Sequence, residues 1–232
     1  MDKPKCSAIV LAAGQGKRMN SKVQKQFLEL DGRPIVYYSL RCFQDSPLIQ
    51  EIILVTGKDN IVFCRDEIVN RFGLSKVTGI VAGGKERYDS VYEGLLACDE
   101  PEFVFIHDGA RPFVTKDILE RGLEGVKKTG ACVIGMPSKD TIKIADEQGC
   151  VESTPRRDRV WTVQTPQIFG FSEIKRAYDR ARETNMDGIT DDAMVMEQYG
   201  EKRVCFAQGS YQNIKITTPD DLVIAAGFLR KT

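Results

Sequence analysis

Histidine is almost absent from this 232-residue chain, because His107 is the only one. Seven cysteines are present, but no two stand closer than 18 residues, so the paired spacing of a zinc site or a redox motif is missing. A Ser-His-Asp triad or a Cys-His pair would depend on this single histidine, and a His-rich metal site would have no second ligand. Several cysteines, Cys42, Cys132 and Cys205 among them, stand inside apolar runs, and we interpret these as small buried side chains in a reducing compartment.

A surplus of positive charge is also missing, since 33 Lys and Arg balance 33 Asp and Glu. A protein that neutralises nucleic-acid phosphates normally carries a basic excess, so we expect no nucleic-acid partner. No apolar run reaches the roughly 18 residues of a membrane span. The first five residues are also too polar and too few for a secretory signal. We therefore expect a cytoplasmic protein with no membrane contact.

The chain does contain short β-rich apolar runs that alternate with stretches of helical period. The runs are apolar on both faces and stand about 20–30 residues apart, which is typical of a parallel sheet covered by helices on both sides. They occupy 7–11, 51–56, 77–82, 103–107 and 131–136. Apolar residues make up 42% and charged residues 28%, which excludes a disordered or fibrous chain. The predicted fold class is α/β.

Start and stop signals between these runs predict helices. The expected helices run from Pro34 to about Phe43, from Asp59 to Phe72, from a Ser172 cap to Thr184, from a Thr190 cap to Gly200, and from Thr218-Pro219 to about Leu229.

Residues 138–160 break the alternation. Short apolar and polar alternation surrounds a Glu-Gln-Gly turn, and no helical period is present, so we expect a β-hairpin arm that projects from the sheet. A two-stranded ribbon is only marginally stable by itself. A second copy of the chain is the simplest support, and we predict a homodimer formed through this arm.

A glycine loop follows the first predicted strand directly, with the sequence Leu-Ala-Ala-Gly-Gln-Gly-Lys-Arg-Met over 11–19. Glycines let the backbone approach a ligand, and consecutive free N–H groups bind anions. The dinucleotide fingerprint would need glycine where Met19 stands. The P-loop would need glycine at Leu11 and Ser or Thr at Arg18. Neither pattern fits, so we predict a phosphate site of another kind.

Positive charge gathers around this loop, since six cations and no acid lie between Lys3 and Leu28. A bound triphosphate would neutralise them, whereas a solvated basic surface is the alternative explanation. The cations are Lys3, Lys5, Lys17, Arg18, Lys22 and Lys25.

Two further predicted strands end in loops of similar character, with Gly-Gly-Lys-Glu-Arg at 83–87 and His-Asp-Gly-Ala-Arg-Pro at 107–112. The carboxyl ends of parallel strands meet at one edge of a sheet, so the three loops predict one composite site. Asp108 could hold Mg²⁺ and Arg111 a second phosphate. Alternatively, Asp108 caps the next turn and pairs with Arg111.

Eight motifs, in order across nearly the whole chain, resemble those of the 2-C-methyl-D-erythritol 4-phosphate cytidylyltransferase family of the non-mevalonate isoprenoid pathway. They are Leu11–Met19, Lys25–Phe27, Gly83–Val91, His107–Pro112, Asp140–Thr141, Trp161–Gln167, Thr190–Ala193 and Asn213–Leu222.

This resemblance implies a transferase that moves CMP from CTP to methylerythritol phosphate and releases pyrophosphate, with Mg²⁺ as cofactor. It implies a single Rossmann-like nucleotidyltransferase domain over 1–232. It also implies a homodimer in which the arm of one subunit reaches the active site of the other. The attacking phosphate oxygen is already ionised, so no strong general base is needed, in agreement with the scarcity of histidine.

The resemblance also assigns site residues by position. Arg18 and Lys25 correspond to residues that stabilise the transition state, and Arg157 and Lys215 to residues that position the acceptor phosphate. Acceptor or metal contacts fall at Asp108, Arg111, Thr141, Thr165 and Thr190, with Asp108 as the metal ligand. CTP contacts fall at Ala12, Ala13, Gly14, Gly16, Gly84, Lys85, Ser90 and Gly109. Lys85 is a departure, because some members carry Asp there.

Two alternatives stay open at this stage. A cytidylyltransferase for another polyol phosphate, such as ribitol 5-phosphate, would share the loop and the fold. A nucleotide-binding regulatory module without turnover would share the pocket but would release no pyrophosphate.

Overall fold

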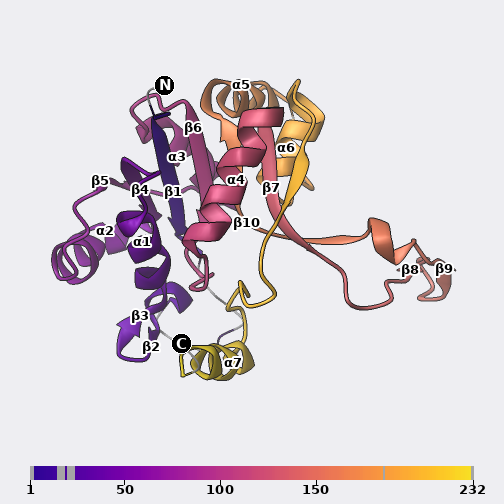
Figure 1. Cartoon of the computed structure of the whole chain (residues 1–232), viewed down its shortest axis with the longest axis horizontal. Coiled ribbons are helices and arrows are strands. Elements are labelled where there is room, and N and C mark those ends of the chain that lie inside the picture. The colour runs from indigo at the N-terminus through magenta and orange to yellow at the C-terminus, as the bar shows by residue number, and fades with distance from the viewer. Residues whose placement is uncertain (1–2, 15–18, 20–23, 185, 231–232) are drawn as a thin grey trace.

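A seven-stranded sheet forms the centre of the computed structural model, which describes residues 3–14, 19, 24–184 and 186–230 (Figure 1). The strand order is β11-β7-β10-β6-β1-β4-β5. The strands are β1 (Cys6–Ala12), β4 (Glu51–Thr56), β5 (Val77–Ala82), β6 (Phe103–Asp108), β7 (Ala131–Pro137), β10 (Trp161–Gly170) and β11 (Cys205–Gln208).

The sheet is mostly parallel, as the sequence predicts. Strand β1 pairs in parallel with both β4 and β6, β4 with β5, and β7 with β11. Strand β10 is the exception, because it runs antiparallel between β6 and β7. All five predicted strands are confirmed. The sequence analysis missed β10, whose Pro166 argues against a central strand, and the pairing with β7 shifts register around that proline. It also missed β11, a short edge strand.

Helices cover both faces of the sheet and produce two buried layers (Figure 1). Alternate side chains of β1 explain this: Val10 faces a core that includes α1 and α4, whereas Ile9 faces one that includes α3, α5 and α6. The helices are α1 (Ile35–Asp45), α2 (Ile61–Phe63), α3 (Arg87–Ala97), α4 (Lys116–Thr129), α5 (Phe171–Arg182), α6 (Asp192–Tyr199) and α7 (Pro219–Leu229).

The structure confirms one of the predicted helix caps and corrects two others. Thr218 and Asp221 form the capping box of α7, as expected. Helix α6 is capped by Asp191, whose carboxylate accepts from the Met194 N–H, and not by Thr190. Helix α5 starts at Phe171, so Ser172 lies inside it. The single helix predicted over 59–72 is instead a 3₁₀ turn η3 (Lys58–Asn60), α2 and a π-helical segment η4 (Cys64–Asn70).

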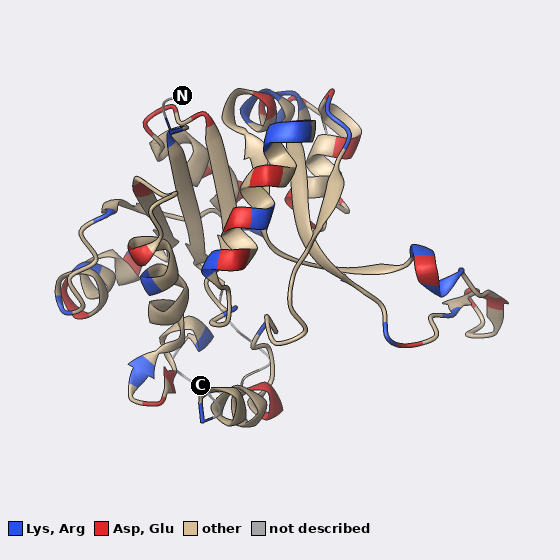
Figure 2. Cartoon of the chain, viewed as in Figure 1, with Lys and Arg blue, Asp and Glu red and all other residues tan. Residues whose placement is uncertain are grey.

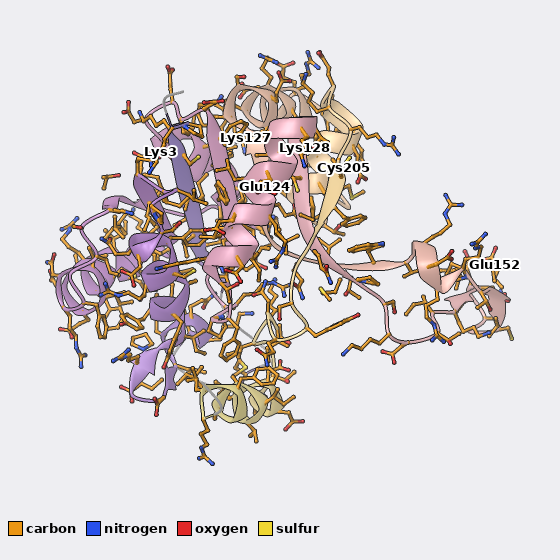
Figure 3. All side chains as sticks on the ribbon, in the orientation of Figure 1. Lys3, Glu124, Lys127, Lys128, Glu152 and Cys205 are labelled. Carbon is orange, nitrogen blue, oxygen red and sulfur yellow. The ribbon has the colours of Figure 1, made fainter. Side chains whose placement is uncertain are left out.

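The predicted arm is present as a hairpin of β8 (Ile144–Ala145) and β9 (Val151–Ser153), followed by the 3₁₀ turn η5 (Arg157–Arg159). It projects away from the sheet and its helices (Figure 1). Glu152 lies near its outer end (Figure 3). The arm carries charges of both signs, whereas the strands of the central sheet carry few (Figure 2).

A small third cluster joins the C-terminal helix to the segment after the glycine loop. Ile216 and Ala225 pack with Leu30 of β2 (Glu29–Leu30) and with Ile35. Strand β2 pairs with β3 (Arg33–Pro34), and both follow the 3₁₀ turn η2 (Lys25–Phe27). Among the described residues, no helix combines the length and the apolar character needed to span a membrane.

Candidate active site

A cavity of about 650 Å³ lies at the carboxyl ends of the parallel strands. The chain passes from β1 outward to β4 and β5, and then returns to the other side of β1 to form β6. Such a reversal of strand order leaves a crevice between the two loops that follow the central strands. The cavity is lined by Leu11, Ala13, Gly14, Lys25, Gln26, Gly84, Lys85, Glu86, Arg87, Ser90, Asp108, Ala110 and Lys215.

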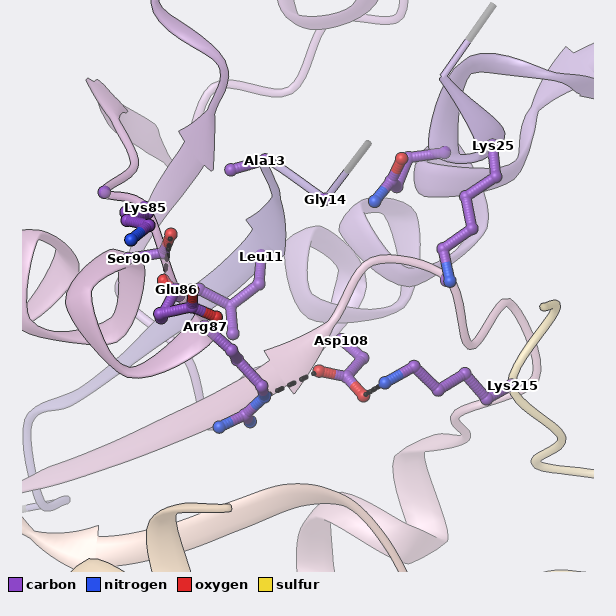
Figure 4. Close-up of a pocket in the computed structure, with 13 residues that line it drawn as sticks. Leu11, Ala13, Gly14, Lys25, Lys85, Glu86, Arg87, Ser90, Asp108 and Lys215 are labelled. Carbon is purple, nitrogen blue, oxygen red and sulfur yellow. Dashed lines mark hydrogen bonds and ion pairs between the residues drawn. The ribbon is translucent and has the colours of Figure 1, made fainter. Parts of the chain in front are cut away.

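The loop after β5 reaches this cavity because α3 crosses back over the sheet to pack on β1 and β4. At Gly84 the backbone passes so close to α3 that a Cβ would lie 2.3 Å from Asp89 Cβ. A larger residue there would push the loop out of place, so glycine is required. The loop thereby brings Lys85 and Ser90 to the wall that Ala13 also lines (Figure 4).

Asp108 occupies the floor of the cavity, with cations on both sides (Figure 4). Lys215 Nζ lies 2.8 Å from its Oδ2, and Arg87 Nε lies 3.3 Å from its Oδ1. Arg111 Nε lies 3.9 Å from Oδ2. Burial raises the pKa of Asp108, but Arg87, Lys215 and Arg111 together hold that pKa well below its usual range. The carboxylate is therefore ionised at neutral pH.

Arg87 connects Asp108 to a second, fully buried carboxylate. Its two terminal nitrogens donate to Asp192 at 2.9 and 2.8 Å, and the Tyr178 hydroxyl donates to the same carboxylate at 2.7 Å. Burial lowers the pKa of Arg87, but the two carboxylates raise it well above the usual value. The guanidinium thus bridges the first turns of α3 and α6.

Lys215 is held in place by its neighbours along the C-terminal segment. The Ile216 N–H donates to the Ala110 carbonyl at 2.9 Å. The buried side-chain amide of Asn213 donates to the Thr165 carbonyl at 2.9 Å, and the Asn213 backbone carbonyl accepts from Arg111 at 2.7 Å. The segment before α7 is therefore tied to the loop after β6 and to the middle of β10. The Lys215 ammonium points into the cavity (Figure 4).

His107 lies behind the cavity and supports it. Its Nε2 is 3.2 Å from the Arg111 carbonyl oxygen. A carbonyl oxygen can only accept a hydrogen bond, so Nε2 is the donor and carries the proton. Nδ1 then accepts from the Thr165 hydroxyl at 3.0 Å, and the Thr165 oxygen accepts from the Asp108 N–H at 3.0 Å. Burial lowers the pKa of His107 to about 4, so the ring is neutral. It orients the loop after β6 and does not face the cavity.

The structure brings most of the predicted site residues to one place. Eight line the cavity: Ala13, Gly14, Lys25, Gly84, Lys85, Ser90, Asp108 and Lys215. Arg111, Thr165 and Gly109 adjoin Asp108, and Ala12 lies buried at the end of β1. Thr190 is exposed just before α6. Thr141 and Arg157 lie on the arm, where Arg157 donates to the Thr141 hydroxyl at 2.7 Å, and neither lines this cavity. Gly16 and Arg18 lie outside the described residues.

The proposed cluster of six cations is wrong as a single group. Lys3 and Lys5 precede β1 and therefore lie at the opposite end of that strand from the cavity. Figure 3 shows Lys3 there. Lys5 pairs with Asp99 there. Lys25 does line the cavity, while Lys17, Arg18 and Lys22 lie outside the described residues.

The sequence analysis missed the cavity residues Leu11, Gln26, Glu86, Arg87 and Ala110, and also the buried partner Asp192. Arg87 and Asp192 each stand at the first position of a helix that follows a loop of the composite site. The opposite charges at these two helix starts were the sequence signal that could have predicted their pairing.

The structure confirms the pairing of Asp108 with Arg111, whose Nε lies 3.9 Å from Oδ2. Mg²⁺ binding by Asp108 and phosphate binding by Arg111 stay predictions. The Arg111 N–H donates to the Asp108 carbonyl at 2.9 Å in a turn, while the Asp108 carboxylate faces the cavity. Within the described part of the chain, no three His, Cys, Asp or Glu side chains form a metal cluster. The single ionised carboxylate of Asp108 at the cavity nevertheless fits Mg²⁺, which proteins usually hold through one or two carboxylates together with substrate phosphates and waters.

The family model described as IspD, 2-C-methyl-D-erythritol 4-phosphate cytidylyltransferase, matches residues 6–231. The chain belongs to this family. Relatives named 2-C-methyl-D-erythritol 4-phosphate cytidylyltransferase include one from Lachnospira eligens, 49% identical over 97% of this chain and 99% of the relative. Another, from Clostridium botulinum strain 657, is 48% identical over 98% of both chains.

Solved structures of IspD proteins have the same fold. The 4-diphosphocytidyl-2C-methyl-D-erythritol synthase of Anaerococcus prevotii is 34% identical and superposes with a TM-score of 0.87 over 98% of this chain and 97% of that one. The match confirms the Rossmann-like nucleotidyltransferase fold that the motifs of this chain predict.

Proposed function

We propose that this IspD family member transfers CMP from CTP to 2-C-methyl-D-erythritol 4-phosphate in the cavity at the carboxyl ends of β1 and β6. The observation that carries the proposal is the convergence of two glycine loops with Lys25, Lys215 and the ionised Asp108. The cytidine lies against Ala13, Gly84, Lys85 and Ser90, with Ala12 and Gly109 as neighbouring backbone. The triphosphate lies beside Gly14 and Lys25, and by family correspondence beside Gly16 and Arg18.

In the reaction, a phosphate oxygen of the acceptor attacks the α-phosphorus of CTP, and the bond from that phosphorus to the bridging oxygen breaks. Pyrophosphate leaves with the electron pair. Both reactants are anions, so the protein must bring them together and stabilise the added charge on the α-phosphate. Lys25 and Arg18 supply that stabilisation, and Lys215 orients the acceptor phosphate. Asp108, Arg111, Thr165 and Thr190 border the acceptor side.

The arm completes the acceptor site of a partner subunit. Arg157 and Thr141 correspond to acceptor contacts but lie on the projecting arm and away from the cavity of their own chain. A homodimer in which each arm reaches the other cavity accounts for both facts. Ile144 and Val151, exposed on the arm at 45% and 62%, would be covered in such a dimer.

We propose Mg²⁺ as the cofactor, with Asp108 as its protein ligand. The ion would supply positive charge to the phosphates of CTP when bound. Arg87 and Lys215 keep Asp108 ionised and fix its orientation, so the carboxylate is ready to accept a cation.

The test is an assay of the purified chain with CTP, Mg²⁺ and methylerythritol phosphate, followed by pyrophosphate release and by mass spectrometry of the cytidine diphosphate product. A parallel reaction contains ribitol 5-phosphate. We expect turnover with methylerythritol phosphate and at least tenfold lower kcat/KM with ribitol 5-phosphate. A higher kcat/KM with ribitol 5-phosphate would identify that compound as the acceptor. CTP binding without pyrophosphate release would indicate a regulatory module.

A further inference from the structure

The ion pair between Arg87 and Asp192 joins a residue that lines the cavity to one that lies behind its lining. Arg87 begins α3, directly after the loop that carries Gly84 and Lys85. Asp192 begins α6, two residues after Thr190. The pair therefore ties the loop between β5 and α3 to the segment between α5 and α6.

Asp192 is fully buried and its carboxylate accepts three hydrogen bonds, two from Arg87 and one from Tyr178. A buried ion pair is weak support for stability, because desolvation of both charges offsets their attraction. This pair also borders the ligand cavity, where 27% of the Arg87 side chain is exposed. These two facts suggest a role in the site and not in stability alone.

The geometry divides the donors of Arg87 between the two carboxylates. Asp192 accepts from both terminal nitrogens in a bidentate pair, and Asp108 accepts from Nε at 3.3 Å. A guanidinium without Asp192 could turn its two terminal nitrogens onto Asp108, because bidentate pairing is the preferred geometry with a carboxylate. Asp108 would then face Arg87 and no longer face the cavity.

Gln167 supports the same arrangement from the strand side. This buried residue of β10 donates from Nε2 to Asp191 Oδ2 at 2.8 Å and accepts at Oε1 from the Ala193 N–H at 2.8 Å. The first turn of α6 is thus clamped on both sides of Asp192, which places its carboxylate opposite Arg87.

We infer that Asp192 is a positioning residue: it holds the terminal nitrogens of Arg87 and so keeps the Asp108 carboxylate directed at the acceptor. The inference rests on the proposed function, because the role of Asp108 toward the acceptor comes from it.

The test compares Asp192→Asn and Arg87→Lys with wild type by steady-state kinetics in both substrates. Asparagine lacks the second anionic oxygen, and lysine cannot make a bidentate pair. We expect kcat/KM for methylerythritol phosphate to fall at least tenfold in each variant, and kcat/KM for CTP to fall at least threefold less. In Arg87→Lys/Asp192→Asn, the second substitution should add less than about threefold, because Asp192 acts through Arg87.

Asp179→Asn is the matched control. Like Asp192, the Asp179 carboxylate of α5 accepts from a tyrosine and a cation, here Tyr92 at 2.8 Å and Lys175 at 2.6 Å, but it lies away from the cavity. It should leave both substrate parameters unchanged. Wild-type acceptor kinetics in Arg87→Lys, or equal losses for CTP and acceptor, would overturn the inference. If Asp192→Asn does not fold, Arg87→Lys decides. Absence of turnover in wild type would instead refute the proposed function.

Discussion

Lys25 is the described residue whose charge the proposed chemistry needs most. It is 9% exposed and lines the cavity. A preorganised charge that stabilises a transition state contributes about 10²–10³ in rate, or roughly 2.7–4 kcal/mol. We expect Lys25→Ala to lower kcat by that factor, and the same loss in Arg18→Ala. Stopped or continuous pyrophosphate assays measure it.

The exposed Lys58 provides the control for this substitution, because it begins η3 and does not line the cavity. Lys58→Ala should retain the wild-type kcat. A folded Lys25→Ala protein with nearly unchanged kcat would remove Lys25 from the mechanism.

His107 makes the stability of the protein sensitive to acid. Its pKa is about 4 in the folded chain, against about 6.5 when exposed. Between these values the unfolded state binds the proton and the folded state does not, so stability falls as pH drops from 6.5 to 4. The loss is about 3 kcal/mol for a shift of this size. Urea denaturation across this range should show it.

His107→Gln is the informative comparison, because glutamine can donate to the Arg111 carbonyl and accept from Thr165 without titrating. The variant should lose less stability than wild type between pH 6.5 and 4. Parallel curves for the two proteins would show that the folded histidine takes up its proton normally.

Among the strands and helices, those buried on both faces were the easiest to predict from the sequence. The strands β1, β4 and β6 are buried on both faces, so their apolar runs identified them without ambiguity. Strand β10 contains Pro166, and its first three residues are not buried, so its sequence shows no continuous buried run. Only its neighbours β6 and β7 on each side make it a strand. The segment 58–70 is clearly helical in pattern, but its 3₁₀ and π turns depend on packing against β5.

Helix α3 offers a test of element packing, because Gly94 lies where it crosses the sheet. A Cβ at Gly94 would lie 2.5 Å from Ile9 Cγ2 and 3.2 Å from Val55 Cγ2. Overpacking of this kind costs about 1–3 kcal/mol. We expect Gly94→Ala to lower the free energy of unfolding by that amount, measured by urea denaturation.

Gly227 in α7 is the matched control, since nothing lies within 4 Å of its added Cβ. Gly227→Ala should leave stability unchanged or raise it by up to about 1 kcal/mol, because alanine favours helix. A Gly94→Ala protein as stable as wild type would mean that α3 can move away from β1 freely.

At the scale of the whole molecule, the arm predicts active sites shared between subunits. Lys25→Ala removes a residue of the cavity, and Arg157→Ala removes one from the arm. Each homodimer should be impaired, Arg157→Ala mainly through a raised KM for the acceptor. Mixed dimers would contain one intact composite site. Subunits unfolded and refolded together in equal amounts should therefore recover about a quarter of wild-type activity by random pairing.

The same two variants mixed without exchange of subunits serve as the control and should show only their summed residual activity. Sedimentation of the wild type measures the assembly state. A monomer with full activity, or no recovery after verified subunit exchange, would contradict the shared site.

The candidate site was only partly visible in the sequence. The three strand-end loops were predicted because glycines and charges after apolar runs are local signals. Arg87 and Asp192 stand 105 residues apart and meet only because α3 and α6 pack on the same face of the sheet. Lys3 and Lys5 show the opposite error: they are near the loop in sequence, but β1 separates them from the cavity along its whole length.

Local chemistry along the chain was sufficient to determine the α/β class, the parallel strands, the projecting arm and the family. These properties depend on side-chain periodicity and on motifs whose residues are close neighbours in sequence. The tertiary structure alone decided that the chain reverses between β5 and β6, that β10 enters the sheet antiparallel, and that Arg87 divides its donors between two carboxylates. Contacts between distant residues depend on how helices pack across a sheet, and no local pattern contains that information.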